Sequence, residues 1–72
     1  MKTFGKISEF DGYNGYIKGI DGKDYLLMQK EITPPEELRV DDKVCFEPDY
    51  FETVETKEDI ARFVKRLDKK SK

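Results

Sequence analysis

Residues 3–29 read TFGKISEFDGYNGYIKGIDGKDYLLMQ, and the predicted architecture of the chain follows from this segment. It is rich in β-branched and aromatic residues, which favour strands, and pairs of turn-forming residues divide it. The divisions leave three segments that we predict to be strands, at residues 3–10, 15–19 and 23–29.

Tight turns should join these strands. Asp11-Gly12 favours a hairpin turn because the central residues of a type I′ turn need positive φ, and Asn14-Gly15 is a second candidate for the same turn. Asp21-Gly22 predicts the next turn. Three strands joined in this way form a meander.

The chain changes character after the third strand. Residues 33–37 read TPPEE and cannot continue a strand, because proline lacks a backbone donor, so we expect a loop with a short helical turn at residues 30–32. Residues 43–47 alternate and predict a fourth strand. We expect Pro48 to end its pairing and residues 49–58 to form a long, exposed, acidic loop.

The C-terminal segment is open to two interpretations. An amphipathic helix, which Thr56 and Asp59 would start, is indicated by the spacing of Ile60, Phe63, Val64 and Leu67. The alternative is a fifth strand at residues 60–67. We expect the remaining residues, 68–72, to be a disordered basic tail.

Composition limits the function. The chain has 72 residues, enough for one domain with one small core, which we place at residues 1–67. It has no His, which removes the commonest general base and metal ligand, so we expect neither an enzyme nor a metal or cofactor site. The acid pairs Glu36/Glu37 and Asp41/Asp42 lack the spacing of a calcium loop.

The sequence also bears on location. A single Cys, Cys45, forms no internal disulfide, which fits a reducing, cytoplasmic compartment. No apolar run approaches the ~20 residues of a membrane span, and the N-terminus continues directly into the first strand, so we expect no signal peptide.

The net charge of −2 is an average over unlike regions. Residues 1–32 carry five basic and five acidic side chains, whereas residues 33–59 carry three basic and ten acidic ones. Residues 60–72 carry six basic and one acidic. Because the local distribution of charge decides what a surface attracts, the net charge does not exclude an anionic partner.

The order of the segments resembles the cold-shock domain family. Gly5-Lys6-Ile7, with Phe10-Asp11, resembles the opening of that family, and Gly15-Tyr16-Ile17 resembles the end of its first ribonucleoprotein motif. Later matches lie at residues 23–32, 38–48 and 61–67, where the family has its second motif and its last two strands. The resemblance implies a five-stranded antiparallel Greek-key barrel of the oligonucleotide/oligosaccharide-binding (OB) type, in which residues 60–67 are a strand that closes the barrel. The main alternative is an SH3-like small barrel with a C-terminal helix.

The family binds single strands by stacking bases on surface aromatic rings. Here Glu9 replaces the Trp of that set, Asn14 replaces a Phe, and Leu26, Met28 and Gln29 replace the rings of the second motif. Tyr16 remains. The resemblance therefore implies a preserved barrel with an altered binding face.

From this resemblance we expect weak, low-specificity binding of single-stranded RNA or DNA by a monomer. The residues expected to bind are Lys6, Tyr13, Tyr16, Asp24, Leu26 and Met28. The alternative is a protein-interaction module that has lost nucleic-acid binding, with a partner at the Leu26/Met28 patch or the acidic 49–59 region. The predicted core is Phe4, Ile7, Phe10, Ile17, Tyr25, Leu27, Ile32, Leu38, Val44, Phe46 and Val64.

Overall fold

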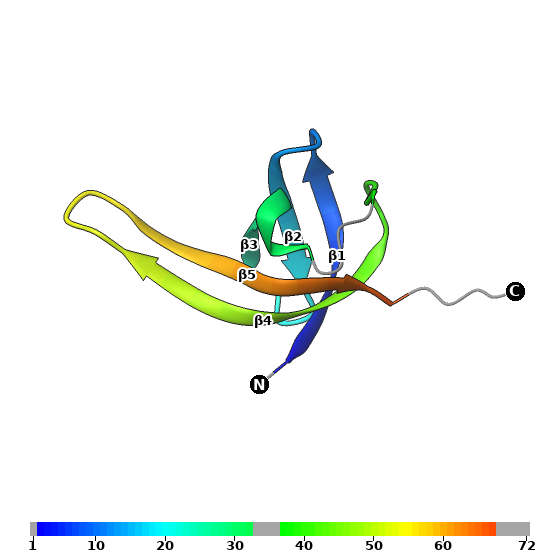
Figure 1. Cartoon of the computed structure of the whole chain (residues 1–72). Helices are drawn as coiled ribbons and strands as arrows, with labels where there is room; N and C mark the ends of the chain where they lie inside the picture. The colour runs from blue at the N-terminus through cyan, green and yellow to red at the C-terminus, as the bar shows by residue number, and fades with distance from the viewer. Residues whose placement is uncertain (1, 33–36, 68–72) are drawn as a thin grey trace, which may run out of the picture.

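A computed structural model describes residues 2–32 and 37–67 (Figure 1). The elements follow in the order β1 (Thr3–Phe10), β2 (Asn14–Gly19), β3 (Asp24–Met28), the 3-10 helix η1 (Gln29–Glu31), β4 (Lys43–Glu52) and β5 (Lys57–Arg66). The expected tail at 68–72 and most of the proline loop, at 33–36, lie outside the described residues.

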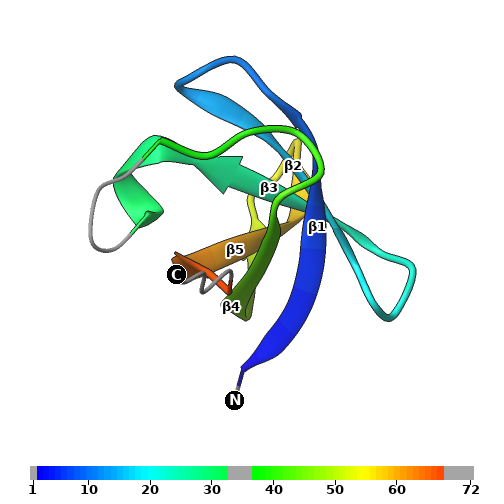
Figure 2. The ribbon, with the colours of Figure 1, turned by 90° about the vertical axis from the view of Figure 1, so that its right-hand side faces the viewer.

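The strands close into a barrel in the order β1-β2-β3-β5-β4 (Figure 2). Neighbouring strands are antiparallel except β3 and β5, which are parallel and paired at Leu26 and Ile60. The all-β fold class and an OB-like closed barrel are thereby confirmed, and the alternative with a C-terminal helix is wrong.

A bulge in β5 explains why its sequence resembles a helix. Cys45 pairs with Lys65 but Glu47 pairs with Arg62, so β5 contains one residue more than β4 across this interval. Phe63 has a φ of 52° there, which is unusual for a bulky side chain. The extra residue puts the inward-facing Ala61 and Val64 three positions apart, which is a helical spacing in the sequence.

The predicted acidic loop is mostly a two-stranded arm, formed by residues 47–62 of β4 and β5. Pairing continues through Pro48, opposite Ala61, to a last pair at Glu52 and Lys57. In Figure 1 this arm projects from the barrel, with its tip in yellow. Among the described residues, β1 pairs with β4 only from Lys43 to Phe46. At Pro48 the edge of β4 that faced β1 therefore has no partner strand, and the missing amide donor of proline does not interrupt the pairing with β5.

The first two turns form at Asp11-Gly12 and Asp21-Gly22, two of the dipeptides that the sequence offered. Gly12 and Gly22 have φ values of 102° and 88°, which non-glycine residues rarely adopt. The Asp11 carboxylate accepts hydrogen bonds from the amides of Tyr13 and Asn14, both at 2.8 Å. Asp11-Gly12 therefore makes the turn, and Asn14-Gly15 begins β2.

Nine residues of the predicted core are buried, together with Ala61. Phe10 packs against them, and the rings of Tyr25 and Phe46 meet at 4.8 Å. The prediction was wrong for Phe4, which is 45% exposed because it alternates with the inward-facing Gly5 and Ile7. No helix among the described residues is long and apolar enough to cross a membrane.

Candidate binding surfaces

Strands β2 and β3 bring three of the predicted binding residues together. Gly15, Ile17, Tyr25 and Leu27 point inward, so the residues between them face outward. On that outer face Tyr16 lies opposite Leu26, and Asn14 lies opposite Met28. All three predicted residues are half-buried rather than open to solvent.

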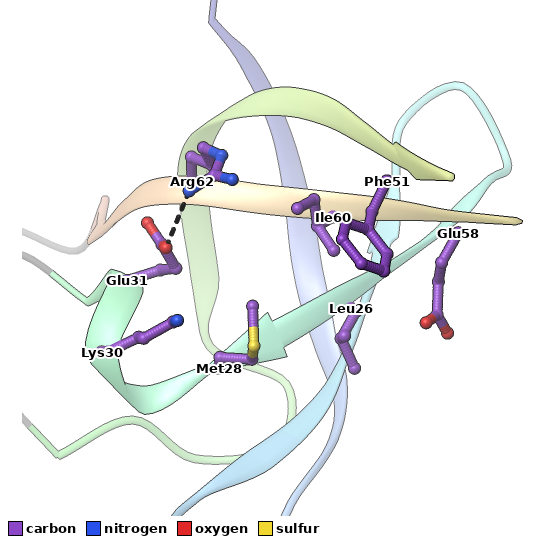
Figure 3. A pocket seen from close by; sticks show the side chains of 8 residues that line it. All are labelled: Leu26, Met28, Lys30, Glu31, Phe51, Glu58, Ile60 and Arg62. Carbon is purple, nitrogen blue, oxygen red and sulfur yellow. Dashed lines mark hydrogen bonds and ion pairs between the residues drawn. The ribbon is translucent and has the colours of Figure 1, made fainter. Parts of the chain in front are cut away.

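The half-burial has a cause that the sequence analysis missed. The arm pairs with β3 at Leu26 and Ile60, and a groove of about 310 Å³ lies between β3, η1 and the arm (Figure 3). We use "the groove" for the space lined by Leu26, Met28, Lys30, Glu31, Phe51, Glu58, Ile60 and Arg62. Phe51 was not predicted because residues 49–58 were assigned to a loop. Ile60 begins the predicted fifth strand but was assigned neither to the core nor to a binding surface.

The charges around Tyr16 are negative. Its hydroxyl donates a hydrogen bond to Glu58 Oε2 at 3.3 Å. The charge of Glu58 raises the pKa of Tyr16, and burial and the nearby Glu9 and Asp24 carboxylates raise it further. Anionic phosphates would meet repulsion on this side of the sheet.

A three-residue clamp fixes one end of the groove. Arg62 on β5 donates from Nε to Asp49 Oδ2 on β4 at 2.6 Å, and from Nη1 to Glu31 Oε2 on η1 at 3.1 Å. The Arg62 guanidinium lowers the pKa of Asp49, and the pKa of Arg62 itself is raised. Figure 3 shows Arg62 reaching across to Glu31, which ties the arm to η1.

The other predicted residues lie elsewhere. Tyr13 is in the turn between β1 and β2, 72% exposed, and does not line the groove. The Asp24 carboxylate forms an ion pair with the Lys18 ammonium group at 3.0 Å. Lys6 belongs to a second surface, formed by β1, β2 and β4.

On this second surface three lysines stand in one row. Lys6 on β1 is opposite Lys18 on β2 and Lys43 on β4. Phe4, two residues before Lys6 and on the same face, flanks the row and is 45% exposed, and Ile20 beside it is 74% exposed. Together these five residues line most of a hollow of about 290 Å³, and we call them the lysine surface.

Few carboxylates offset these charges. Within residues 2–32 and 37–67, Lys18 pairs with Asp24, while neither Lys6 nor Lys43 forms an ion pair. Like charges directly opposite each other on neighbouring strands are destabilising. The row therefore holds unneutralised positive charge next to an exposed aromatic ring.

In the described part of the chain, no group of three His, Cys, Asp or Glu side chains is placed to hold a metal ion. Cys45 is a half-buried free thiol. Comparison of the sequence with protein-family models and with curated proteins finds no match, so the cold-shock resemblance stays a prediction.

Proposed function

We propose that this protein binds single-stranded RNA or DNA weakly, with little sequence selectivity, as a cytoplasmic monomer. The observation that carries the proposal is the row of Lys18, Lys6 and Lys43 beside the exposed ring of Phe4. Of the six residues expected from the sequence, Lys6 keeps its role in this proposal.

The lysine surface has the two components that non-selective binding of a single strand requires. Phosphates would neutralise Lys6 and Lys43, which form no ion pair among the described residues, whereas Lys18 is already paired with Asp24. Each phosphate contact makes affinity salt-dependent. The Phe4 ring offers a flat face for one base, and such stacking contributes about 1–3 kcal/mol per base. Each phosphate contact with a single strand contributes about −0.7 to the slope of log affinity against log salt concentration. Two or three contacts at the lysine surface therefore predict a slope of about −1.4 to −2.1.

The face that carries Tyr16 is the weaker candidate for nucleic acid. Tyr16 is hydrogen-bonded to Glu58, and Glu9 pairs with Tyr16 across the strands. A phosphate approaching Leu26 or Met28 would pass these carboxylates. The expected base-stacking role of Tyr16 therefore gains no support from its surroundings.

The test is a titration of labelled protein with short oligo-dT and oligo-U at low salt. We expect resonance shifts at Phe4, Lys6 and Lys43, and loss of those shifts in the Lys6→Glu/Lys43→Glu variant. Lys57→Glu, which changes a lysine on the arm, is the matched control and should bind as the parent does. No shifts at millimolar oligonucleotide, or shifts confined to Tyr16, Leu26 and Met28, would overturn the proposal.

A further inference from the structure

We propose that the end of the arm docks on the lysine surface of a second copy of this chain, with Val54 inserted between the lysines. We use "the tip" for residues 52–57, where β4 ends and β5 begins. The proposal concerns the same lysine surface as the proposed function but does not require nucleic acid. It rests on the exposure of Val54, on the charges of the two patches and on the length of β5.

The tip presents an apolar side chain in a turn, where polar residues and glycine are usual. The Thr53 amide donates to the Thr56 carbonyl at 2.7 Å, and the Thr53 hydroxyl accepts from the amides of Glu55 and Thr56 at 3.2 and 3.0 Å. Val54 lies inside this hydrogen-bonded turn and is fully exposed. The turn therefore holds Val54 away from its own barrel, where another molecule can cover it.

The arm carries an excess of negative charge. Residues 47–62 include six acidic and two basic side chains, a net of −4. Within the described part of the chain, Asp49 is the one acid of the arm in an ion pair, with Arg62. Glu52 and Glu55 form none, and neither does Lys57 at the same end. The tip therefore offers two carboxylates without ion-pair partners on either side of its apolar side chain.

The hollow of the lysine surface complements the tip in charge and in polarity. No carboxylate is among the described residues that line it, and its volume of about 290 Å³ suits one or two side chains. Lys6 and Lys43 form no ion pair within residues 2–32 and 37–67, so Glu52 and Glu55 would give each of them a partner. Val54 would meet the apolar side chains of the lining, which are Phe4, Ile20 and Leu67.

Only a second copy can bring the two patches together. Leu67, which lines the hollow, follows the last residue of β5, whereas Lys57 at the tip is the first residue of that strand. At about 3.3 Å per residue, β5 separates them by about 30 Å. Figure 1 shows the tip and the far end of β5 on opposite sides of the molecule. The tip of one chain therefore cannot reach the hollow of the same chain.

Docking of this kind joins unlike patches, so it does not close on a pair of copies. Each end of an assembly keeps a tip or a hollow to which a further copy can add. One hairpin tip should bury less surface than the about 1,200 Å² of a stable interface, so we expect weak association that needs a high protein concentration. A single strand would use the same Lys6 and Lys43, so the strand-bound form is the monomer of the proposed function.

The test is sedimentation equilibrium at low salt, up to millimolar protein and without nucleic acid. We expect the average mass of the parent to rise with concentration. Glu52→Lys/Glu55→Lys puts cations on both patches and Lys6→Glu/Lys43→Glu puts carboxylates on both, so each variant alone should associate at least about tenfold more weakly. A mixture of the two should recover association, because each tip then meets a hollow of opposite charge. A parent that stays monomeric, or a mixture that does, would overturn the proposal.

A pair of valine variants separates docking from non-specific attraction. Val54→Ser should weaken association about tenfold, the size of effect seen at interface anchors. Val40→Ser, at an exposed valine outside both the tip and the hollow, is the matched control and should associate as the parent does. Equal association of Val54→Ser and the parent would contradict insertion of the valine. None of these measurements contains an oligonucleotide, so this proposal and the proposed function fail independently.

Discussion

The lysine surface and the groove lie on the outside of one small barrel but differ in charge. The first holds a row of three lysines, whereas the second sets Lys30 and Arg62 beside Glu31 and Glu58. The outer face of β2 carries Lys18 of the lysine surface and, two residues away, Tyr16, which lies opposite Leu26 of the groove. The row through Lys18 continues to Lys6 and Lys43, whereas the row through Tyr16 continues to Glu9, Leu26 and Ile60. Strand register therefore separates the charges that the net value of −2 averages.

A bulge in β1 sharpens this separation. The register between β1 and β2 shifts between Ile7 and Glu9, so Glu9 rather than Ser8 stands opposite Tyr16. Ser8 donates to the Tyr16 carbonyl at 3.2 Å. With uninterrupted alternation Glu9 would point inward, so the bulge adds a carboxylate to the acidic side of the molecule.

The largest expected effect comes from Gly15→Ala, which should disrupt both surfaces at once. A Cβ at this position would overlap the Glu9 carbonyl oxygen and would meet Phe10 Cα at 2.6 Å, and both are backbone atoms. Overpacking of this kind costs about 1–3 kcal/mol, occasionally more. We expect a clear fall in the denaturation midpoint. A midpoint equal to that of the parent would show that β1 does not approach β2 so closely.

Lys6→Glu should separate stability from binding. The new carboxylate would lie between Lys18 and Lys43, which converts two repulsive pairs into attractive ones worth about 0.2–1 kcal/mol each. We expect a more stable protein, measured by urea denaturation, that no longer binds oligo-dT. Reduced stability would instead indicate that Lys6 supports the fold, and the charge argument for the lysine surface would then fail.

Glu58→Gln should lower the pKa of Tyr16, because the negative charge of Glu58 is the main cause that raises it. A raised folded-state pKa stabilises the protein below the unfolded value of 10.0, and that contribution is lost as pH rises through the folded value. The variant should therefore be less stable than the parent at neutral pH and approach it in alkaline solution. Absorbance of tyrosinate measures the titration. Tyr25 is the internal control: its hydrogen bond to Asp21 raises its pKa to about 12, and Glu58 takes no part in that. An unchanged Tyr16 titration would contradict the acidic character of this side.

The smallest effect is expected from Phe63→Gly in the β5 bulge. A left-handed backbone costs a residue with a side chain about 1–2 kcal/mol, and glycine avoids this cost but loses more entropy on folding. The two contributions nearly cancel, so we expect a change in unfolding free energy within about 1 kcal/mol and unchanged binding of oligo-dT. Phe63→Val, which is β-branched and keeps the strain, should be less stable than Phe63→Gly.

The fold was more predictable than the binding surfaces. Glycine-containing turns and alternation located β1 to β3, and Ile17, Tyr25 and Leu27 are buried as expected. The arm escaped prediction because Pro48 and a run of acids look like a loop, and only pairing with β5 makes them a strand. Tyr16, Leu26 and Met28 do lie together, but the groove that Leu26 and Met28 share with Phe51 depends on that arm.

The residues alone were enough to predict the first three strands, the turn at Asp21-Gly22 and the inward-facing residues of β2 and β3. These properties depend on residues a few positions apart, whose backbone preferences and alternation are local. The tertiary structure alone decided the charge of each surface. Lys6 meets Lys43, and Tyr16 meets Glu58, across 37 and 42 positions of chain. Such neighbours are set by the closure of the barrel and by its two bulges, which no local pattern specifies.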